Sequence, residues 1–255
     1  MNPLITMRGD SKRPVERPGM RIIPSIVLVA LGILLGPGSL HVSAADDDGV
    51  ALGILYDTSG SMKDRVPDSH HGTSPIYVIA NHALLEVVKQ IQAYTSSGGT
   101  NAPHKIDVGL FIFDKSDAKE VVKLEPFNAA AIQHWTTNFS NPNGGTPLGN
   151  ALDTVSQAVL DSPQPRKHVL VITDGENTVG PNPDKVLSGL NRAAEKTQKP
   201  LFVHFIAFDV DAKVFNGVKK QGASVASAAD EKQLNSQLDF ILQNQILLEK
   251  PSNTK

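Results

Sequence analysis

Five side chains in this sequence carry oxygen donors and stand at the ends of strand-like apolar runs or just before a helical pattern: Asp57, Ser59, Ser61, Thr146 and Asp174. Carboxylate and hydroxyl oxygens are hard donors that suit Mg²⁺, Mn²⁺ or Ca²⁺. The set contains neither the Cys nor the His ligands that would indicate zinc. Ser59 and Ser61 alternate around Gly60, which lets the chain turn tightly so that both hydroxyls can point at one ion. The residue types therefore predict a divalent-cation site.

The composition of the 255 residues excludes several other kinds of site. There is no Cys, which excludes a disulfide framework, a thiolate metal site and a catalytic thiol. The 24 Lys and Arg residues are balanced by 26 Asp and Glu residues, and the resulting net charge of −2 argues against a nucleic-acid-binding surface. A hydrophobic fraction of 40% is ordinary for a folded domain.

The first 45 residues have the pattern of an export signal. A basic stretch is followed by the apolar run 26–35, a Gly-Pro-Gly break and the small residues 42–45. This run is about half of the ~20 residues that a membrane-spanning helix needs. We predict a signal peptide at 1–45, with an uncleaved N-terminal anchor as the alternative. In both cases the remainder is exported, to the periplasm, the cell surface or the medium, and only this segment would touch a membrane.

Between this signal and a polar tail at 251–255, residues 46–250 form one predicted domain in which strand and helix patterns alternate. Strands are predicted at 50–56, 106–113, 120–124, 168–173, 201–207 and 223–226. Helices are predicted at 76–94, 129–135, 148–160, 183–196, 211–220 and 231–248. The alternation indicates parallel crossovers, because a helix between two strands gives the chain enough length to return to the same end of a sheet.

The order of these elements predicts a doubly wound α/β fold with a mostly parallel six-stranded sheet and helices on both faces. The connection between strands 106–113 and 120–124 is too short for a parallel crossover, so strand 120–124 is an antiparallel edge strand. Right-handed crossovers favour this doubly wound topology, for which we consider the strand order 3-2-1-4-5-6. Strand 50–56 then lies beside strand 168–173, and such sheets bind ligands where the carboxyl ends of these two strands open. The predicted fold therefore brings both carboxylates of the set to one crevice.

Three segments together resemble the metal-ion-dependent adhesion site of von Willebrand factor type A domains. They are Asp57-x-Ser59-x-Ser61 after the first strand, Gly144-Gly-Thr-Pro-Leu148 before a helix, and Thr173-Asp-Gly175 after the fourth strand. Their order is that of the family, and the resemblance covers nearly all of 49–249. It implies that Ser59, Ser61 and Thr146 ligate the ion through their hydroxyls. It also implies that Asp57 and Asp174 act directly or through water, and that a partner carboxylate fills an open position.

Neutral hydroxyl ligands leave the ion with uncompensated positive charge, and Mg²⁺ retains exchangeable waters. An Asp or Glu of a partner can replace one water, so we expect a non-enzymatic module that binds a protein partner through the ion. A Mg²⁺-dependent hydrolase is the alternative. Against it, the sequence lacks the acidic residue two positions after Asp57 that an aspartyl-phosphate phosphatase needs, and the Lys of a phosphate-binding loop. It also lacks the His-Glu-x-x-His and Gly-x-Ser-x-Gly motifs.

Several residues also have a structural interpretation. Thr146 before Pro147 has the pattern of a helix N-cap followed by Pro at the first helical position, a role compatible with metal ligation. Glu176 is predicted to be a solvated loop residue, with modulation of the site as the alternative. Trp135 and the Phe residues are predicted to pack in the core.

The segment 62–75 separates the first predicted strand from the next helix, and its Pro and Gly residues prevent it from extending that helix. Because it begins beside the predicted site, we expect it to lie over the rim of the crevice. Arg65, His70 and His71 would then contribute to partner selectivity. An ordinary solvated loop is the alternative, since loops vary freely.

Overall fold

The computed structural model describes residues 49–97 and 104–248, which belong to one folded unit. The predicted signal peptide and the polar tail at 251–255 lie outside these residues. The strands are β1 (Val50–Tyr56), β2 (Arg65–Pro67), β3 (Thr73–Pro75), β4 (Ile106–Asp114), β5 (Asp117–Pro126), β6 (Arg166–Thr173), β7 (Leu201–Phe208) and β8 (Ser224–Ala228). The α-helices are α1 (Ile76–Ser96), α2 (Ala129–Asn138), α3 (Leu148–Asp161), α4 (Pro183–Thr197), α5 (Asn216–Lys220) and α6 (Glu231–Ile241). Three other helical segments are η2 (Gly60–Lys63), η3 (Ala212–Phe215) and η4 (Leu242–Leu247).

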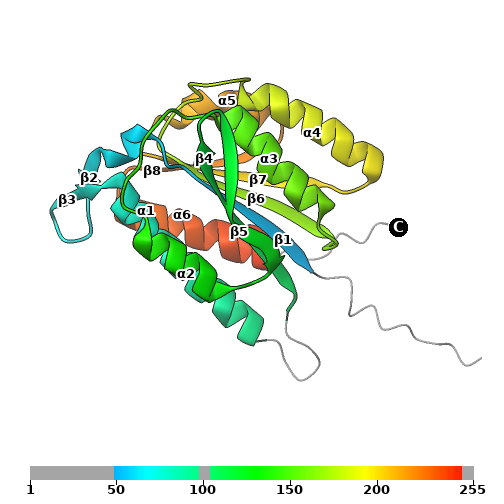
Figure 1. Cartoon of the computed structure of the whole chain (residues 1–255), viewed down its shortest axis with the longest axis horizontal. Coiled ribbons are helices and arrows are strands. Elements are labelled where there is room, and N and C mark those ends of the chain that lie inside the picture. The colour runs from blue at the N-terminus through cyan, green and yellow to red at the C-terminus, as the bar shows by residue number, and fades with distance from the viewer. Residues whose placement is uncertain (1–48, 98–103, 249–255) are drawn as a thin grey trace, which may run out of the picture. The chain divides into compact units, whose positions relative to one another are not determined.

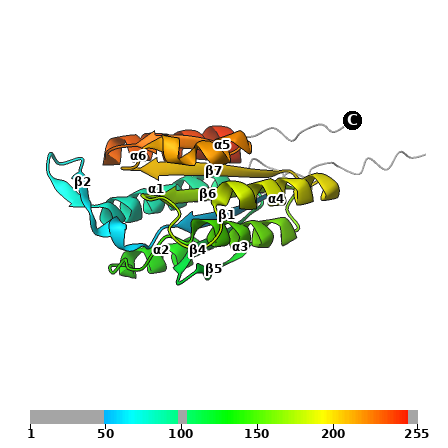
Figure 2. The same ribbon diagram turned by 90° about the horizontal axis from the view of Figure 1, so that it is seen from above.

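Six strands form one sheet in the order β5-β4-β1-β6-β7-β8, which matches the order 3-2-1-4-5-6 considered from the sequence. β1 pairs in parallel with β4 and β6, and β7 and β8 continue the parallel pairing. β5 pairs antiparallel with β4 after the two-residue turn Lys115-Ser116. In Figure 2 the arrows of β1 and β7 point the same way, toward the end of the sheet where β2 projects. The predicted fold class is therefore confirmed.

Both faces of the sheet are buried, which is why the central strands are continuous apolar runs. All seven residues of β1 are buried. Leu52, Ile54 and Tyr56 belong to a core shared with α1, α2 and α6, whereas Ala51 and Leu55 belong to a core shared with α3, α4 and α5. Figure 1 shows the same division, with α1, α2 and α6 on one side of the strands and α3 and α4 on the other.

Helix α3 packs very closely on β1. A Cβ at Gly53 would stand 2.5 Å from a methyl group of Val155 and 2.8 Å from one of Val159, so a side chain at this position would push the helix away. The absence of a side chain at Gly53 thus allows α3 to pack closely on the sheet.

Three regions differ from the predicted elements. The segment 62–75 contains an antiparallel hairpin in which Arg65 pairs with Pro75 across β2 and β3. The predicted helix 211–220 is divided into η3 and α5, and the predicted helix 231–248 changes at Leu242 from α-helix to the π-helical η4. Among the described helices, none combines the length and the apolar character needed to cross a bilayer.

The prediction that the Phe residues pack in the core is wrong at two positions. Phe202 is 39% exposed at the start of β7, where it stacks on His168, and Phe240 is 53% exposed on the outer face of α6. Trp135, by contrast, packs against Tyr56 and Phe139, with ring centroids 5.5 and 4.9 Å away.

Candidate metal centre

The carboxyl ends of β1 and β6 lie side by side and carry the two acidic residues of the predicted site. Asp57 follows β1 directly, and its backbone N–H donates to the carbonyl of Ile172 on β6 at 3.0 Å. Asp174 follows β6 directly. This is the point where the strand order reverses, because α3 covers one face beside β1 and α1 covers the other. The two acidic residues therefore lie at the end of the sheet where such folds bind ligands.

Hydrogen bonds connect four of the five predicted residues in one chain. The Ser59 amide donates to Oδ1 of Asp57 at 2.7 Å. The hydroxyls of Ser59 and Ser61 are 3.1 Å apart, and Ser61 Oγ donates to Oδ1 of Asp174 at 3.0 Å. Residues that are more than 110 positions apart in the sequence thus come into direct contact through a short turn in which Gly60 separates the two serines.

Thr146, the fifth residue, reaches the same place from the loop before α3. The Gly60 amide donates to the carbonyl of Gly144 at 3.0 Å, and Gly144 has a φ of +91°, which glycine adopts without strain. A Cβ placed on Gly175 would lie 3.6 Å from Thr146 Oγ1 and 3.9 Å from Ser61 Oγ. Both hydroxyls therefore border the same small space, which the missing side chain of Gly175 leaves open.

The predicted capping role of Thr146 is wrong. Helix α3 begins at Leu148, so Pro147 occupies the N-cap position and no side chain caps the helix. Thr146 is held through its backbone instead: its amide donates to Thr178 Oγ1 at 2.8 Å, and its carbonyl accepts from the Thr178 amide at 2.9 Å. The hydroxyl of Thr146 is therefore not used to start the helix.

The electrostatics of the centre are unfavourable for two ionised carboxylates. Asp57 is fully buried and Asp174 is 9% exposed. Burial raises the pKa of Asp57, although hydrogen bonds from Ser59 and Thr173 oppose the shift. Burial, and next the charge of Asp57, raise the pKa of Asp174 to about 7. A bound cation would favour the ionised form of both groups, because an opposite charge at close range offsets burial and mutual repulsion.

The donor set fits a hard divalent cation. Within 49–97 and 104–248, no group of three or more His, Asp or Glu side chains is placed to hold a metal ion. An ion at this centre would thus depend on the hydroxyls as well as on the two carboxylates. Ser61 is exposed whereas Asp57 and Ser59 are buried, so the centre opens to solvent on one side. The residues fit Mg²⁺, Mn²⁺ or Ca²⁺ with coordination positions left for water or a partner.

Sequence reasoning missed residues that hold the centre in place. Thr173 Oγ1 donates to Oδ2 of Asp57 at 2.6 Å, and the Asn177 side chain accepts from the Gly149 amide at 3.0 Å. Thr173 is the last residue of β6, directly before Asp174, and this position in the sequence could have indicated that it contacts the site. The roles of Asn177 and Thr178 have no sequence signal, because polar residues in a loop are ordinary.

The other residues considered in the sequence line a different cavity or make contacts elsewhere. Glu176 is exposed and lines a neighbouring cavity. Arg65 bonds to Thr73 within its own hairpin. His70 and His71 are at the exposed tip of that hairpin, where the adjacent Ser69 amide donates to Glu231 of α6 at 2.8 Å. The tip is therefore held by α6.

A doubly wound α/β domain with a cluster of acidic and hydroxyl side chains at its switch point is thus defined. The family model of the von Willebrand factor type A domain matches residues 52–239. The chain therefore belongs to the von Willebrand factor type A domain family. No match to a curated protein was found for the sequence.

Solved structures with the same fold share little sequence with this chain. The PilB minor pilin of Streptococcus sanguinis has a TM-score of 0.59 at 16% identity, over 76% of this chain and 60% of that one. Proximal thread matrix protein 1 of the mussel byssus, with a zinc-occupied MIDAS motif, has a TM-score of 0.55 at 18% identity, over 77% and 48%. The vWF domain of the type V pili tip protein Mfa5 of Porphyromonas gingivalis has a TM-score of 0.56 at 12% identity, over 77% and 95%. The match thus spans about half of the byssus protein and 60% of the minor pilin.

Proposed function

We propose that this protein is an exported, non-enzymatic binding module that holds a protein partner through a divalent cation. The cation is Mg²⁺, with Mn²⁺ or Ca²⁺ as substitutes, and the residues that hold it are Asp57, Ser59, Ser61, Thr146 and Asp174. The observation that carries the proposal is the convergence of these five side chains, from three distant segments, on one buried and partly open space.

Each part of the centre has a distinct task in this proposal. The two carboxylates attract the cation, and the hydroxyls of Ser59, Ser61 and Thr146 complete its protein ligands without neutralising it further. The bound ion supplies positive charge at the opening of the crevice. An Asp or Glu side chain of the partner is the group that such a charge recognises. Thr173 and the Ser59 amide orient the buried carboxylate of Asp57, so the centre is preorganised.

Export places this binding activity outside the cytoplasm, through the predicted signal at 1–45. The similar structures are described as a minor pilin, a pilus tip protein and a byssus matrix protein, and such descriptions support a role in adhesion or assembly outside the cell. The hydrolase alternative has less support. His70, His71 and Glu176, which it would recruit as a base, lie on the hairpin tip and on a neighbouring cavity.

The proposal is tested by calorimetry and thermal unfolding of the purified domain with Mg²⁺, Mn²⁺ and Ca²⁺, before and after chelation. We expect a rise in melting temperature that depends on ion concentration, as mass action requires. Asp57→Ala should remove this rise and leave a folded protein. Capture of partners from envelope extracts should likewise require the ion. Turnover of a generic phosphate ester that is lost in Asp57→Ala would favour the hydrolase instead.

A further inference from the structure

A cavity of about 320 Å³ is lined by the start of α3, the loop after β6, the start of α4 and the segment 214–218. Leu148, two residues after Thr146, lies on one side of it, and Glu176, two residues after Asp174, lies on another. The Gly149 amide donates to Asn177, and a Cβ at Gly149 would stand 1.9 Å from the Pro181 carbonyl oxygen. These contacts join the start of α3, close to Thr146, to the loop that follows Asp174.

The buried part of the lining, here called the floor, is apolar, and the amide side chains of Asn177 and Asn182 also line the cavity. Leu148, Phe215 and Val218 line it and are at most 3% exposed. Val214, at 39% exposed, adds apolar surface where the cavity meets solvent. The volume is at the small end of ligand sites, which run from about 300 to 1,000 Å³, and it matches one side chain better than a large cofactor.

The charged groups that line the cavity are all acidic. Glu176 and Asp184 contribute carboxylates, and no Lys, Arg or His is among the lining residues. Asp184 lies directly on the backbone of α5, because a Cβ at Gly217 would stand 3.1 Å from its carboxyl carbon. Glycine at position 217 therefore makes room for this carboxylate at the cavity.

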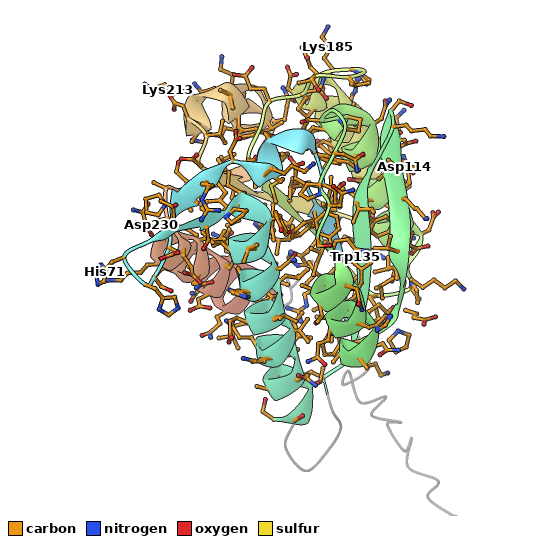
Figure 3. The ribbon with its side chains drawn as sticks, turned by 60° about the vertical axis from the view of Figure 1, so that its left-hand side comes forward. His71, Asp114, Trp135, Lys185, Lys213 and Asp230 are labelled. Atoms are coloured by element: carbon orange, nitrogen blue, oxygen red, sulfur yellow. The ribbon has the colours of Figure 1, made fainter. Side chains whose placement is uncertain are left out.

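Lys185, Lys213 and Lys219 are sequence neighbours of lining residues but do not themselves line the cavity. Lys213 pairs with Asp211 at 3.7 Å. Figure 3 shows the side chains of Lys213 and Lys185 pointing outward from the molecule. The cavity thus combines an apolar floor with two carboxylates, a combination that suits an aliphatic stem carrying a cationic head.

We propose that this cavity binds a Lys or Arg side chain of the same partner segment whose carboxylate reaches the metal centre. This inference rests on the proposed function, which it makes more specific: the partner presents an acidic and a basic residue a short distance apart. The stem would pack on Leu148, Phe215 and Val218, and the head would pair with Glu176 and Asp184. The metal ion would then bind the partner's carboxylate, and the cavity would bind the partner's cationic side chain.

The first test does not depend on the metal. Butylguanidinium and its neutral isostere butylurea are titrated into ¹⁵N-labelled protein in the presence of chelator. We expect butylguanidinium to shift the amide signals of Gly217 and Val218, with an affinity at least tenfold above that of butylurea. Equal effects of the two compounds, or no effect of either, would overturn the proposal and leave the proposed function intact.

The second test uses the Mg²⁺-loaded protein and a peptide library with one fixed Glu and all other positions varied. We expect Lys and Arg to be enriched at one spacing from that Glu. The double variant Glu176→Gln/Asp184→Asn should reduce this enrichment at least tenfold, and Glu195→Gln, an exposed acid of α4 outside the cavity, should keep it. Mg²⁺-dependent binding without a cationic preference would overturn only this inference, whereas binding that does not depend on Mg²⁺ would overturn the proposed function as well.

Discussion

Charged side chains are buried at both ends of the central strands, in different surroundings. At the amino end of β6, Lys167 donates to the carbonyl of Ser162, and Asp107 of β4 accepts from the side chains of Ser162 and Gln164 at 3.3 and 3.1 Å. Burial and the nearby Lys199 lower the pKa of Lys167 to about 8, and the charge of Asp107 opposes this shift. This end contains both a buried cation and a buried anion from the same chain.

At the carboxyl end, the buried groups are two carboxylates. Asp57 and Asp174 receive hydrogen bonds from hydroxyls and amides, and no salt bridge to either is found within the described residues. Because these two buried carboxylates have no cationic partner among the described residues, the pKa of each is raised. The difference teaches that the amino end pairs its buried charges within the chain, whereas the carboxyl end concentrates negative charge that, under the proposed function, an external cation would balance.

The largest effect is expected from a change at the amino end. Lys167→Ala removes a buried stem and leaves the Ser162 carbonyl without its donor, so it should lower the free energy of unfolding by about 2–4 kcal/mol. The loss should be the same with and without Mg²⁺, as measured by urea denaturation. Restoration of wild-type stability by Mg²⁺ would contradict the claim that the amino end stabilises the fold independently of the carboxyl end.

A change at the carboxyl end should have the opposite sign. Asp174→Asn removes one of two repelling carboxylates, so we expect the metal-free protein at pH 8 to gain about 1–3 kcal/mol of unfolding free energy. The same variant should lose its response to Mg²⁺. The matched change Asp107→Asn should bring no gain. Destabilisation of metal-free protein by Asp174→Asn, measured by the same denaturation, would contradict the comparison.

A smaller effect is expected from a hydroxyl. Thr146→Val keeps the shape of the side chain and both backbone hydrogen bonds to Thr178. It should weaken Mg²⁺ binding about tenfold, or roughly 1.4 kcal/mol, with little change in metal-free stability. Isothermal titration calorimetry measures the first quantity and thermal unfolding the second. Unchanged Mg²⁺ affinity would remove Thr146 from the centre.

The smallest effect concerns pH. The folded-state pKa of Asp174, at about 7, lies above its ordinary value of 3.8, so the folded protein holds a proton that the unfolded chain releases. Stability of the metal-free protein should therefore fall as pH rises, by roughly 1 kcal/mol between pH 6 and pH 8. Saturating Mg²⁺ should flatten this dependence. A rise in metal-free stability over the same interval would show that burial and the charge of Asp57 do not raise the pKa of Asp174.

The sequence predicts the sheet well because its signals are local and strong. Continuous apolar runs indicate buried parallel strands, and the two-residue turn after Asp114 leaves only an antiparallel hairpin for β5. The acidic and hydroxyl set is predictable because each member stands at the end of such a run or just before a helix. The resemblance to a known family adds the grouping of three segments.

Other features depend on contacts that no local pattern reveals. The hairpin of β2 and β3 has a single buried residue, Val66, and is stabilised by Asp68 and by the distant Glu231. Pro147 takes the N-cap position because the backbone of Thr146 is held by Thr178, 32 residues further along the chain. These arrangements arise from tertiary packing, which overrides the local preference for a Thr cap followed by Pro.

The central claim is that five side chains share one cation, and anomalous diffraction from crystals of the Mn²⁺-loaded protein tests it most directly. We expect one strong manganese peak at the carboxyl ends of β1 and β6, within coordination distance of the hydroxyls of Ser59, Ser61 and Thr146. A crystal saturated with Mn²⁺ that shows no peak there, or shows its only peak beside other residues, would contradict the account.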